Sequence, residues 1–377
     1  MIALLLTIST SWSTEAEVDS ETEAPAEPRR VQLGSPEDDY YFEADRVVGN
    51  LLADIRTIRA LGNVKLIQGT TTVTADEMYY YDREKIALLK GNVVVVESER
   101  NARITGEYLE YHRESRYVIV TQSPLLTITD AAGGDVLIQG KVMEYYLDED
   151  RGTASGDVQI DQDNLHAEGD QADYHGDDNL IILDGDPIAW RDEDKVGGEL
   201  MTMYLLDEEG GLEKVVVEGT ARAVYYAAGE EEEPEIAGEP EEGYEEDSAN
   251  PVEDERQGKL ELAADLMTLF YVDDSADRIL CEGNATALYI PDPTSGEEGT
   301  IDASAQNITI YLQDDIATQI TLDGDARSIY YPDPEGETSR GRTEMNGSHM
   351  DLFLVDGELD RYVVRGDARG SYRPDSD

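Results

Sequence analysis

The fold is decided by the stretch Leu61-Gly62-Asn63-Val64-Lys65-Leu66-Ile67-Gln68-Gly69 and its continuation Thr70-Thr71-Thr72-Val73-Thr74-Ala75-Asp76-Glu77-Met78. After the Gly-Asn pair, apolar and polar side chains alternate, which is typical of a strand with one buried face. The small Ala75 and the polar Asp76 interrupt this alternation, as a sharp bend or bulge does where a larger side chain would crowd the backbone. The stretch therefore predicts two antiparallel strands, each with a corner or bend midway.

A pattern of this kind returns about every thirty residues, so that the chain holds eight or nine copies of it. Each copy opens with Gly, then Asn or Asp, then a small apolar residue. Such self-similarity indicates stacked supersecondary units, none of which buries its apolar face alone. Gly219-Thr220-Ala221 is a weaker copy and Ser123-Pro124-Leu125 a degenerate one. The clear copies begin at Gly62, Gly91, Gly156, Gly185, Gly283, Gly324 and Gly366.

Short acidic turns follow the second strand of most copies. Asp82-Arg83-Glu84-Lys85 and Asp148-Glu149-Asp150-Arg151 fit hairpin turns, and His112 and His175 share one place at the entry to such a turn. No segment carries an apolar stripe at helical spacing that is long enough for a helix. We therefore predict an all-β, solenoid-like chain.

Composition divides the chain into four parts. Residues 1–36 are a signal-like segment and acidic linker, because the short apolar run Ile2 to Ile8 resembles the core of a secretory signal and is too short to cross a bilayer. Residues 37–228 form the front half of the β body and residues 260–377 its back half. Between them, residues 229–259 are rich in Glu and Pro, which predicts a disordered acidic insert. The signal-like start predicts export.

The net charge of −56 argues against a nucleic-acid partner, because binding to backbone phosphates requires Lys and Arg. The acids fall on turns and on outward strand positions, which predicts a solvated shell that keeps strand edges apart. The 22 tyrosines suit half-buried strand positions, where the ring packs and the hydroxyl stays wet. The lone Cys281 leaves no internal disulfide and is predicted to be a packing residue.

Signals of catalysis or metal binding are missing from the sequence. The four histidines have no metal-ligand spacing with Cys or with each other, and neither a phosphate loop nor a nucleophile elbow occurs. Aspartate pairs such as Asp161 and Asp163 fit turns better than calcium sites. We therefore predict a protein that is not an enzyme and that has no cofactor and no metal.

The stretch 61–78 resembles the characteristic sequence of the OstA-like family, which includes the lipopolysaccharide carrier LptA and the amino-terminal domain of LptD. The Gly-Asn-Val corner, Gln68-Gly69 and Ala75-Asp76 stand where that family has them, and Tyr40-Tyr41-Phe42-Glu43-Ala44-Asp45 resembles its first strand. The resemblance is specific over residues 40 to 112 and continues more weakly to the end. It implies an elongated, open β-jellyroll in which V-shaped strands stack into a trough with an apolar lining.

For function, the resemblance implies a periplasmic protein that binds lipopolysaccharide through lipid A and carries it to the outer membrane. The acyl chains would lie in the trough, and LptC-like and LptD-like partners would stack on its ends; self-association is left open. The implied lining, which the alternation also selects, is Tyr40, Phe42, Val64, Leu66, Val73, Met78, Tyr80, Val93, Val95, Ile104, Leu109, Tyr111, Ile138, Met143 and Tyr145.

Two other functions compete with the carrier. One is a structural or adhesive β-solenoid at the cell surface, with a closed core and no lipid. The other is a β-stacked enzyme acting on polysaccharide, whose carboxylates would be hidden among the many acids. The chain is about twice as long as a single-jellyroll carrier, and its acidity is unfavourable for binding phosphorylated lipid A unless the acids face outward. Sequence does not decide whether an LptA-, LptC- or LptD-like component fits best.

Overall fold

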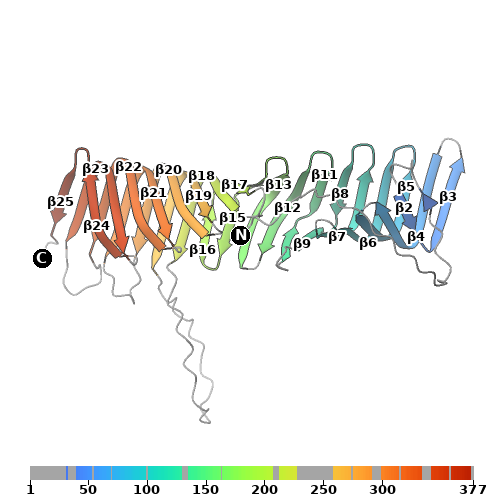
Figure 1. Cartoon of the computed structure of the whole chain (residues 1–377), viewed down its shortest axis with the longest axis horizontal. Coiled ribbons are helices and arrows are strands. Elements are labelled where there is room, and N and C mark those ends of the chain that lie inside the picture. Colours follow the sequence, from blue (N-terminus) through green and yellow to red (C-terminus); the bar gives the residue numbers. More distant parts are fainter. Residues whose placement is uncertain are drawn as a thin grey trace, which may run out of the picture. The chain divides into compact units, whose positions relative to one another are not determined.

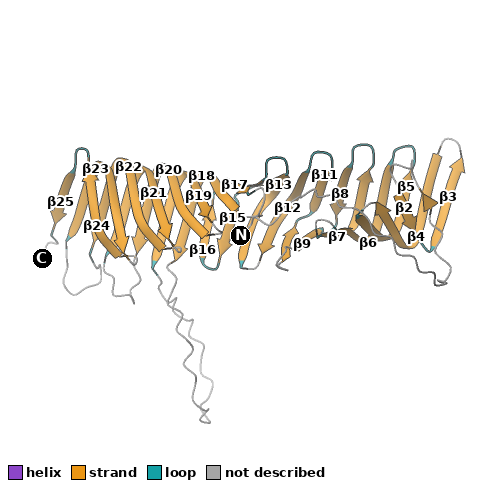
Figure 2. Ribbon diagram, in the orientation of Figure 1, coloured by secondary structure: helices purple, strands orange, loops and turns teal. Residues whose placement is uncertain are grey.

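Every regular element of the described residues is a β-strand, which confirms the predicted all-β class (Figure 2). The computed structural model describes residues 31–32, 40–52, 55–68, 70–98, 101–129, 135–162, 164–206, 212–226, 258–272, 275–290, 299–313, 316–332, 341–355 and 358–374. Within these ranges no helix is present that could cross a membrane. The signal-like run Ile2 to Ile8 and nearly all of the predicted insert 229–259 lie outside them.

Contacts divide the described residues into two units. Unit 1 runs to Asp192 and includes Gly197–Val217, whereas unit 2 contains Glu193–Val196 and the residues from Glu218 onward. The strands of unit 1 are β1 (Val31–Gln32), β2 (Tyr40–Glu43), β3 (Arg46–Leu52), β4 (Ile55–Gln68), β5 (Thr71–Tyr81), β6 (Ile86–Glu97), β7 (Ala102–His112), β8 (Tyr117–Thr121), β9 (Leu125–Thr129), β10 (Asp135–Gln139), β11 (Val142–Tyr146), β12 (Arg151–Gln162), β13 (Leu165–His175), β14 (Leu180–Asp184), β15 (Ile188–Arg191) and β17 (Leu200–Leu205).

Unit 2 continues the same hairpin pattern with longer strands (Figure 1). The strands β16 (Asp194–Gly197) and β18 (Leu212–Tyr226) are divided between the units. The strands that belong wholly to unit 2 are β19 (Lys259–Val272), β20 (Ser275–Ile290), β21 (Thr300–Gln313), β22 (Ile316–Tyr331), β23 (Arg342–Val355), β24 (Glu358–Arg365) and β25 (Arg369–Arg373).

Each predicted corner consists of two successive residues in the left-handed conformation. Gly62 and Asn63 have φ values of 73° and 46°. Leu61 pairs with Glu77 and Val64 with Ala75, so the two corner residues together oppose one residue of the next strand. Such an extra residue is a β-bulge, which bends the strand. Left-handed φ is accessible to Gly and tolerated by Asn and Asp, so the repeated Gly-Asn or Gly-Asp pair is the cause of the bend.

The degenerate copy at Ser123 is a true corner, but it begins one residue earlier than the sequence suggested. Gln122 and Ser123 have φ values of 65° and 61°, and they stand where other copies have Gly and Asn. Pro124 is buried and takes the place of Val64. The prediction aligned Ser123 with the glycine because a Gln in left-handed conformation has no sequence signal.

The corners divide the long strands into two arms. Arm A ends in the hairpin turns that join β5 to β6 and β7 to β8; arm B ends in those that join β4 to β5 and β6 to β7. In β6, for example, Ile86–Lys90 lies in arm A and Val93–Glu97 in arm B, and each part pairs antiparallel with its neighbours. Each unit is therefore a stack of bent antiparallel strands, as the predicted open jellyroll requires.

Alternation places one face of both arms against a shared core. In unit 1, Phe42, Val64, Met78, Leu89 and Val93 are at most 1% exposed. In unit 2 the corresponding inward side chains include Met267, Ile279, Cys281, Ile308, Leu322 and Met350, all fully buried. Burial of a side chain of this size stabilises the fold by about 1.5–3 kcal/mol.

Candidate functional site

The predicted lining residues of unit 1 fall into two classes of burial. One class is closed off from solvent, and the other is half-buried, with most of its members packed against the first. The side chain of Tyr40 lies outside the described residues. The buried class is Phe42, Val64, Met78, Tyr80, Val93, Leu109 and Met143. The half-buried class is Leu66, Val73, Val95, Ile104, Tyr111, Ile138 and Tyr145.

The half-buried residues of arm B form one continuous cross-strand row, here called the aliphatic row. Leu66 pairs directly with Val73, and Val73 pairs with Val95. The register then continues through strands β7, β9 and β10 without a break. Neighbouring strands lie about 4.8 Å apart, so six residues in register span about 24 Å. The members of the aliphatic row are Leu66, Val73, Val95, Ile104, Leu126 and Ile138.

Arm A carries a matching row in which tyrosines alternate with smaller side chains. Tyr80 pairs with Ala87, which pairs with Tyr111, and Tyr145 pairs with Gly152. A Cβ on Gly152 would lie 3.0 Å from the Tyr145 ring, so the missing side chain leaves room for that ring. The members of this tyrosine row are Tyr80, Ala87, Tyr111, Val118, Tyr145, Gly152 and Tyr174.

Leu126 and Tyr174 are among the members of these rows that the sequence interpretation did not include in the lining. Leu126 pairs with Ile104 on one side and with Ile138 on the other, so it closes the aliphatic row between them. It was missed because the copy around Ser123 was aligned one residue late. The Ala172–Tyr174 alternation in β13 was visible in the sequence and would have identified Tyr174 once its partner Gly152 was known.

Charged side chains near these rows lie mainly on the opposite face of the strands. Glu77, which precedes the buried Met78, accepts a 2.8 Å hydrogen bond from Arg59 Nε and a 2.9 Å bond from the Tyr79 hydroxyl. The hydrogen bond from Arg59 holds the pKa of Glu77 below its usual value. An inward exception is Glu97, which accepts a hydrogen bond from the Thr71 hydroxyl at the end of arm B.

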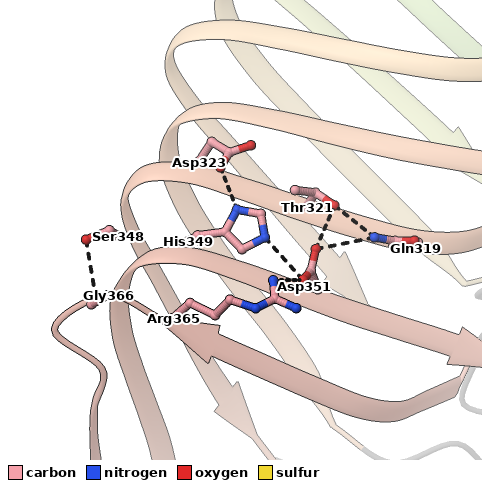
Figure 3. Close-up of polar contacts among 8 residues, drawn as sticks. All are labelled: Gln319, Thr321, Asp323, Ser348, His349, Asp351, Arg365 and Gly366. Carbon is pink, nitrogen blue, oxygen red and sulfur yellow. Dashed lines mark hydrogen bonds and ion pairs between the residues drawn. The ribbon is translucent and has the colours of Figure 1, made fainter.

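A second charged cluster lies on the outer face of arm A in unit 2 (Figure 3). The two ring nitrogens of His349 contact Asp323 Oδ1 at 2.5 Å and Asp351 Oδ2 at 3.1 Å. Arg365 Nη1 donates to the same Asp351 oxygen at 2.6 Å. The hydrogen bond to Asp323 raises the pKa of His349. This cluster links three neighbouring strands, β22, β23 and β24.

The predicted turn-entry histidines lie as expected, each as the last residue of a strand. His112 ends β7 and His175 ends β13, and a turn follows each. His112 Nε2 contacts Glu110 Oε1 at 2.5 Å, and its ring lies 5.5 Å from that of Tyr117. Among the described residues, no group of His, Cys, Asp and Glu is arranged to hold a metal ion.

A stack of bent strands whose inner faces carry continuous apolar rows defines a jellyroll of the OstA-like class. Residues 43–209 match the family model described as LptA/(LptD N-terminal domain) LPS transport protein. Over these residues, which are fewer than half of the chain, the sequence matches that family, in agreement with the resemblance deduced from residues 61–78. By its description the family is one of transport proteins, not of enzymes.

Comparison with solved structures finds LptH of Pseudomonas aeruginosa, described as the LptA homologous periplasmic component of the conserved lipopolysaccharide transport device. The two chains are 16% identical, and the match covers 30% of this chain and 82% of LptH with a TM-score of 0.28. No curated protein matches this sequence.

Proposed function

We propose that the chain is a lipopolysaccharide-binding transport protein that holds the acyl chains of lipid A between the inner faces of arms A and B. The observation that carries this proposal is the aliphatic row, which crosses six strands in register and is half-buried beside a closed core. A buried methylene contributes about 0.8 kcal/mol, so such a row offers binding energy along its whole length. Because neighbouring positions are chemically alike, their binding energies for an acyl chain are similar. A bound chain can therefore shift along the row without having to escape from one deep energy minimum.

The placement of charge supports the same function. Acids such as Glu77 and Glu110 precede or follow inward residues and therefore point away from the inner face. Sugars and phosphates of the cargo would stay in water beyond the ends of the arms. The net charge of −56 is compatible with an anionic cargo where the acids of the described strands alternate with inward residues in this way.

The match of residues 43–209 to the family model supports an exported, periplasmic location and delivery toward the outer membrane. The strand edges support end-to-end stacking with LptC-like and LptD-like proteins, or with a second copy. Val47 and Val48 of the edge strand β3 are 42% and 45% exposed, and Tyr362 of β24 is 44% exposed. Unpaired edges with apolar side chains are templates for adding a further strand.

Photocrosslinking tests the binding proposal. A benzophenone amino acid placed at Leu66 or Ile104 should crosslink labelled lipopolysaccharide, because both belong to the aliphatic row. The matched control is Val94, which neighbours Val95 on the same strand but lies on the opposite face. No crosslink from the row, or an equal yield from Val94, would contradict lipid binding and leave the structural β-solenoid as the better explanation.

Cysteine crosslinking tests the stacking proposal. Val47→Cys and Tyr362→Cys place single thiols on the two edges, and the native Cys281 is fully buried and does not interfere. Disulfide dimers that form only when both variants are mixed would support head-to-tail self-association. Capture of an LptC-like or LptD-like cysteine variant instead would support a bridge, and capture of neither would contradict stacking.

A further inference from the structure

Four arginines gather on one face of the last strands of unit 2. In arm B, the inward residues Ser328, Met345 and Gly370 pair in register across β22, β23 and β25. The residues between them therefore point to the outer face. There Arg327 is in register with Asn346 and Arg369, and Arg342 is in register with Arg373. We call Arg327, Arg342, Arg369 and Arg373 the arginine patch.

The patch is unusual in a chain with 85 acidic residues and only 29 Lys and Arg. One acidic residue, Glu344, lies within the patch. It is opposite Ser371, between the line formed by Arg327 and Arg369 and the pair Arg342 and Arg373. Glu344 Oε1 accepts a 3.0 Å hydrogen bond from Arg327 Nε, and this bond, together with that from Asn346, lowers the pKa of Glu344. The charge of Glu344 is thus already engaged. The next acid in register, Asp302, is one strand farther away on β21.

The remaining three arginines have no partner of this kind among the residues that the structure describes. No ion pair within these ranges joins Arg342 or Arg369 to a carboxylate, and Arg373 forms none either but attracts Glu344 through space, which helps to lower the pKa of that acid. Arg369 and Arg373 are exposed, and Arg342 is half-buried. Elsewhere on the C-terminal strands arginines do have partners: Arg365 is paired with Asp351, and Arg361 stacks 4.4 Å above the Phe353 ring.

Arg342 and Arg373 are directly opposite each other on neighbouring strands. Side chains in this relation have Cβ atoms about 4.5–5.5 Å apart, and like charges placed so are destabilising. An anion bound between them converts this repulsion into attraction. Guanidinium groups bind phosphate with two parallel hydrogen bonds, so a tetrahedral phosphate suits two opposed arginines better than a single carboxylate does. Arg327 and Arg369 lie about 13 Å farther along their strands and would reach toward it from one side.

We propose that the arginine patch is a binding site for phosphate groups attached to sugar. The phosphate could belong to the headgroup of a bound glycolipid or to a soluble sugar phosphate; the chemistry of recognition is the same. The headgroup as source rests on the proposed function, whereas phosphate binding itself does not. Bound there, a phosphorylated headgroup would be held at the C-terminal strands of unit 2, in a chain that is otherwise strongly acidic.

The test compares the full-length protein with the double variant Arg342→Gln/Arg373→Gln. Arg361→Gln is the matched control, because it removes an arginine of the same terminal strands that lies outside the patch. Probes are glucose 1-phosphate, lipopolysaccharide, and lipopolysaccharide dephosphorylated with phosphatase. Thermal unfolding followed by circular dichroism shows whether each variant is folded, and removing two opposed like charges should not lower its midpoint.

If the proposal is right, the double variant binds glucose 1-phosphate or phosphorylated lipopolysaccharide at least about tenfold more weakly, since each lost charge-assisted contact is worth a factor of that order. The control variant binds normally. A difference between phosphorylated and dephosphorylated lipopolysaccharide that disappears in the double variant identifies the lipid headgroup as source; binding of glucose 1-phosphate alone identifies a soluble one. Equal binding of every probe by wild type and double variant overturns the proposal and leaves the patch as a surface for an acidic protein.

Failure of this proposal is distinguishable from failure of the lipid-binding function. Crosslinks from Leu66 and Ile104 depend on the aliphatic row of unit 1 and should persist in the double variant. Crosslinks from the aliphatic row, without a difference between phosphorylated and dephosphorylated lipopolysaccharide, would contradict only the phosphate site at the arginine patch. Phosphate binding without crosslinks from the aliphatic row would contradict only the binding of acyl chains between the arms.

Discussion

The side-chain amide of Asn63 donates a 2.9 Å hydrogen bond to the carboxylate of Asp45, which lies in the bend between β2 and β3. The same contact recurs in the next copy from Asn92 to Asp76 at 2.8 Å, and in unit 2 from Asn284 to Asp265 at 2.9 Å. Two motifs that look separate in the sequence, Gly-Asn and the small-polar pair, are thus the two halves of one tether between neighbouring strands. The tether holds the bend of one strand against the corner of the next.

Gly91 should be among the least replaceable residues of unit 1. Its φ is +75°, and a Cβ at this position would lie 2.4 Å from Asp76 Oδ2. Gly91→Ala therefore adds backbone strain and displaces the tether, and we expect a loss of about 1–3 kcal/mol in unfolding free energy. Urea unfolding measures this loss. Asn92→Gly is the control, because it removes the hydrogen bond but keeps the left-handed conformation accessible; it should cost less than Gly91→Ala. Equal costs would mean that backbone conformation is not the source of the effect.

Substitutions of Met78 and Leu66 should distinguish a residue that only stabilises the core from a residue that also binds lipid. Met78 is 1% exposed in the centre of the core, so Met78→Ala should lower stability by about 2–5 kcal/mol. Leu66 is half-buried in the aliphatic row, so Leu66→Ala should cost less stability but reduce the amount of lipopolysaccharide that copurifies with the protein. Urea unfolding and quantification of bound lipid on the same preparations give both values. If Leu66→Ala lowers stability as much as Met78→Ala and leaves bound lipid unchanged, the row is ordinary core.

The sequence was sufficient to predict the strands, the corners and the inward face, because each depends on local chemistry. Glycine at positive φ and alternation with a period of two are visible in a single copy of the repeat. The corner at Gln122 and Ser123 was misplaced by one residue, because its conformation is imposed by the neighbouring copies and not by its own residue types.

Features that depend on the register between strands could not be predicted from the sequence. Leu126 joins the aliphatic row only through its pairing with Ile104 and Ile138. Arg342 and Arg373 are separated by a whole hairpin in the chain, and nothing local indicates that they lie opposite each other. Whether the lining residues bind lipid remains a prediction.

Raising the pH should weaken the C-terminal strands of unit 2. The hydrogen bond to Asp323, together with Asp351, raises the pKa of His349 in the folded protein. Its contribution to stability is therefore complete below the unfolded value of about 6.5 and is lost as pH rises through the folded pKa. Burial raises the pKa of Asp351, but hydrogen bonds from Arg365 and His349 outweigh it and leave the pKa lowered, so Asp351 stays ionised across this range.

Amide hydrogen exchange of β23 and β24 at about pH 6 and about pH 9, corrected for the intrinsic exchange rate, measures this effect. Protection should fall at the higher pH in the wild type. His349→Gln has no ionisable ring, so its protection should change little between the two conditions. A wild type whose corrected protection is the same at both values would show that the imidazolium does not stabilise these strands.

Cys281 should react only when unit 2 unfolds, which makes it a reporter of that unit. Its side chain is fully buried in β20, and burial raises the pKa of the thiol to about 12. Both the lack of access and the scarcity of thiolate suppress alkylation, because the thiolate is the reactive form. Iodoacetamide labelling along a urea gradient should therefore be negligible until the unfolding transition and then become complete. Cys281 is the single cysteine of the chain, so mass spectrometry of the intact protein gives the labelled fraction directly.

The same experiment on the variant Met78→Ala, a change confined to unit 1, tests whether the two units unfold together. The urea concentration at half-labelling should stay the same if the units unfold independently and should shift if they unfold together. Rapid labelling without urea would mean that β20 opens in the native protein and that the core of unit 2 is not closed.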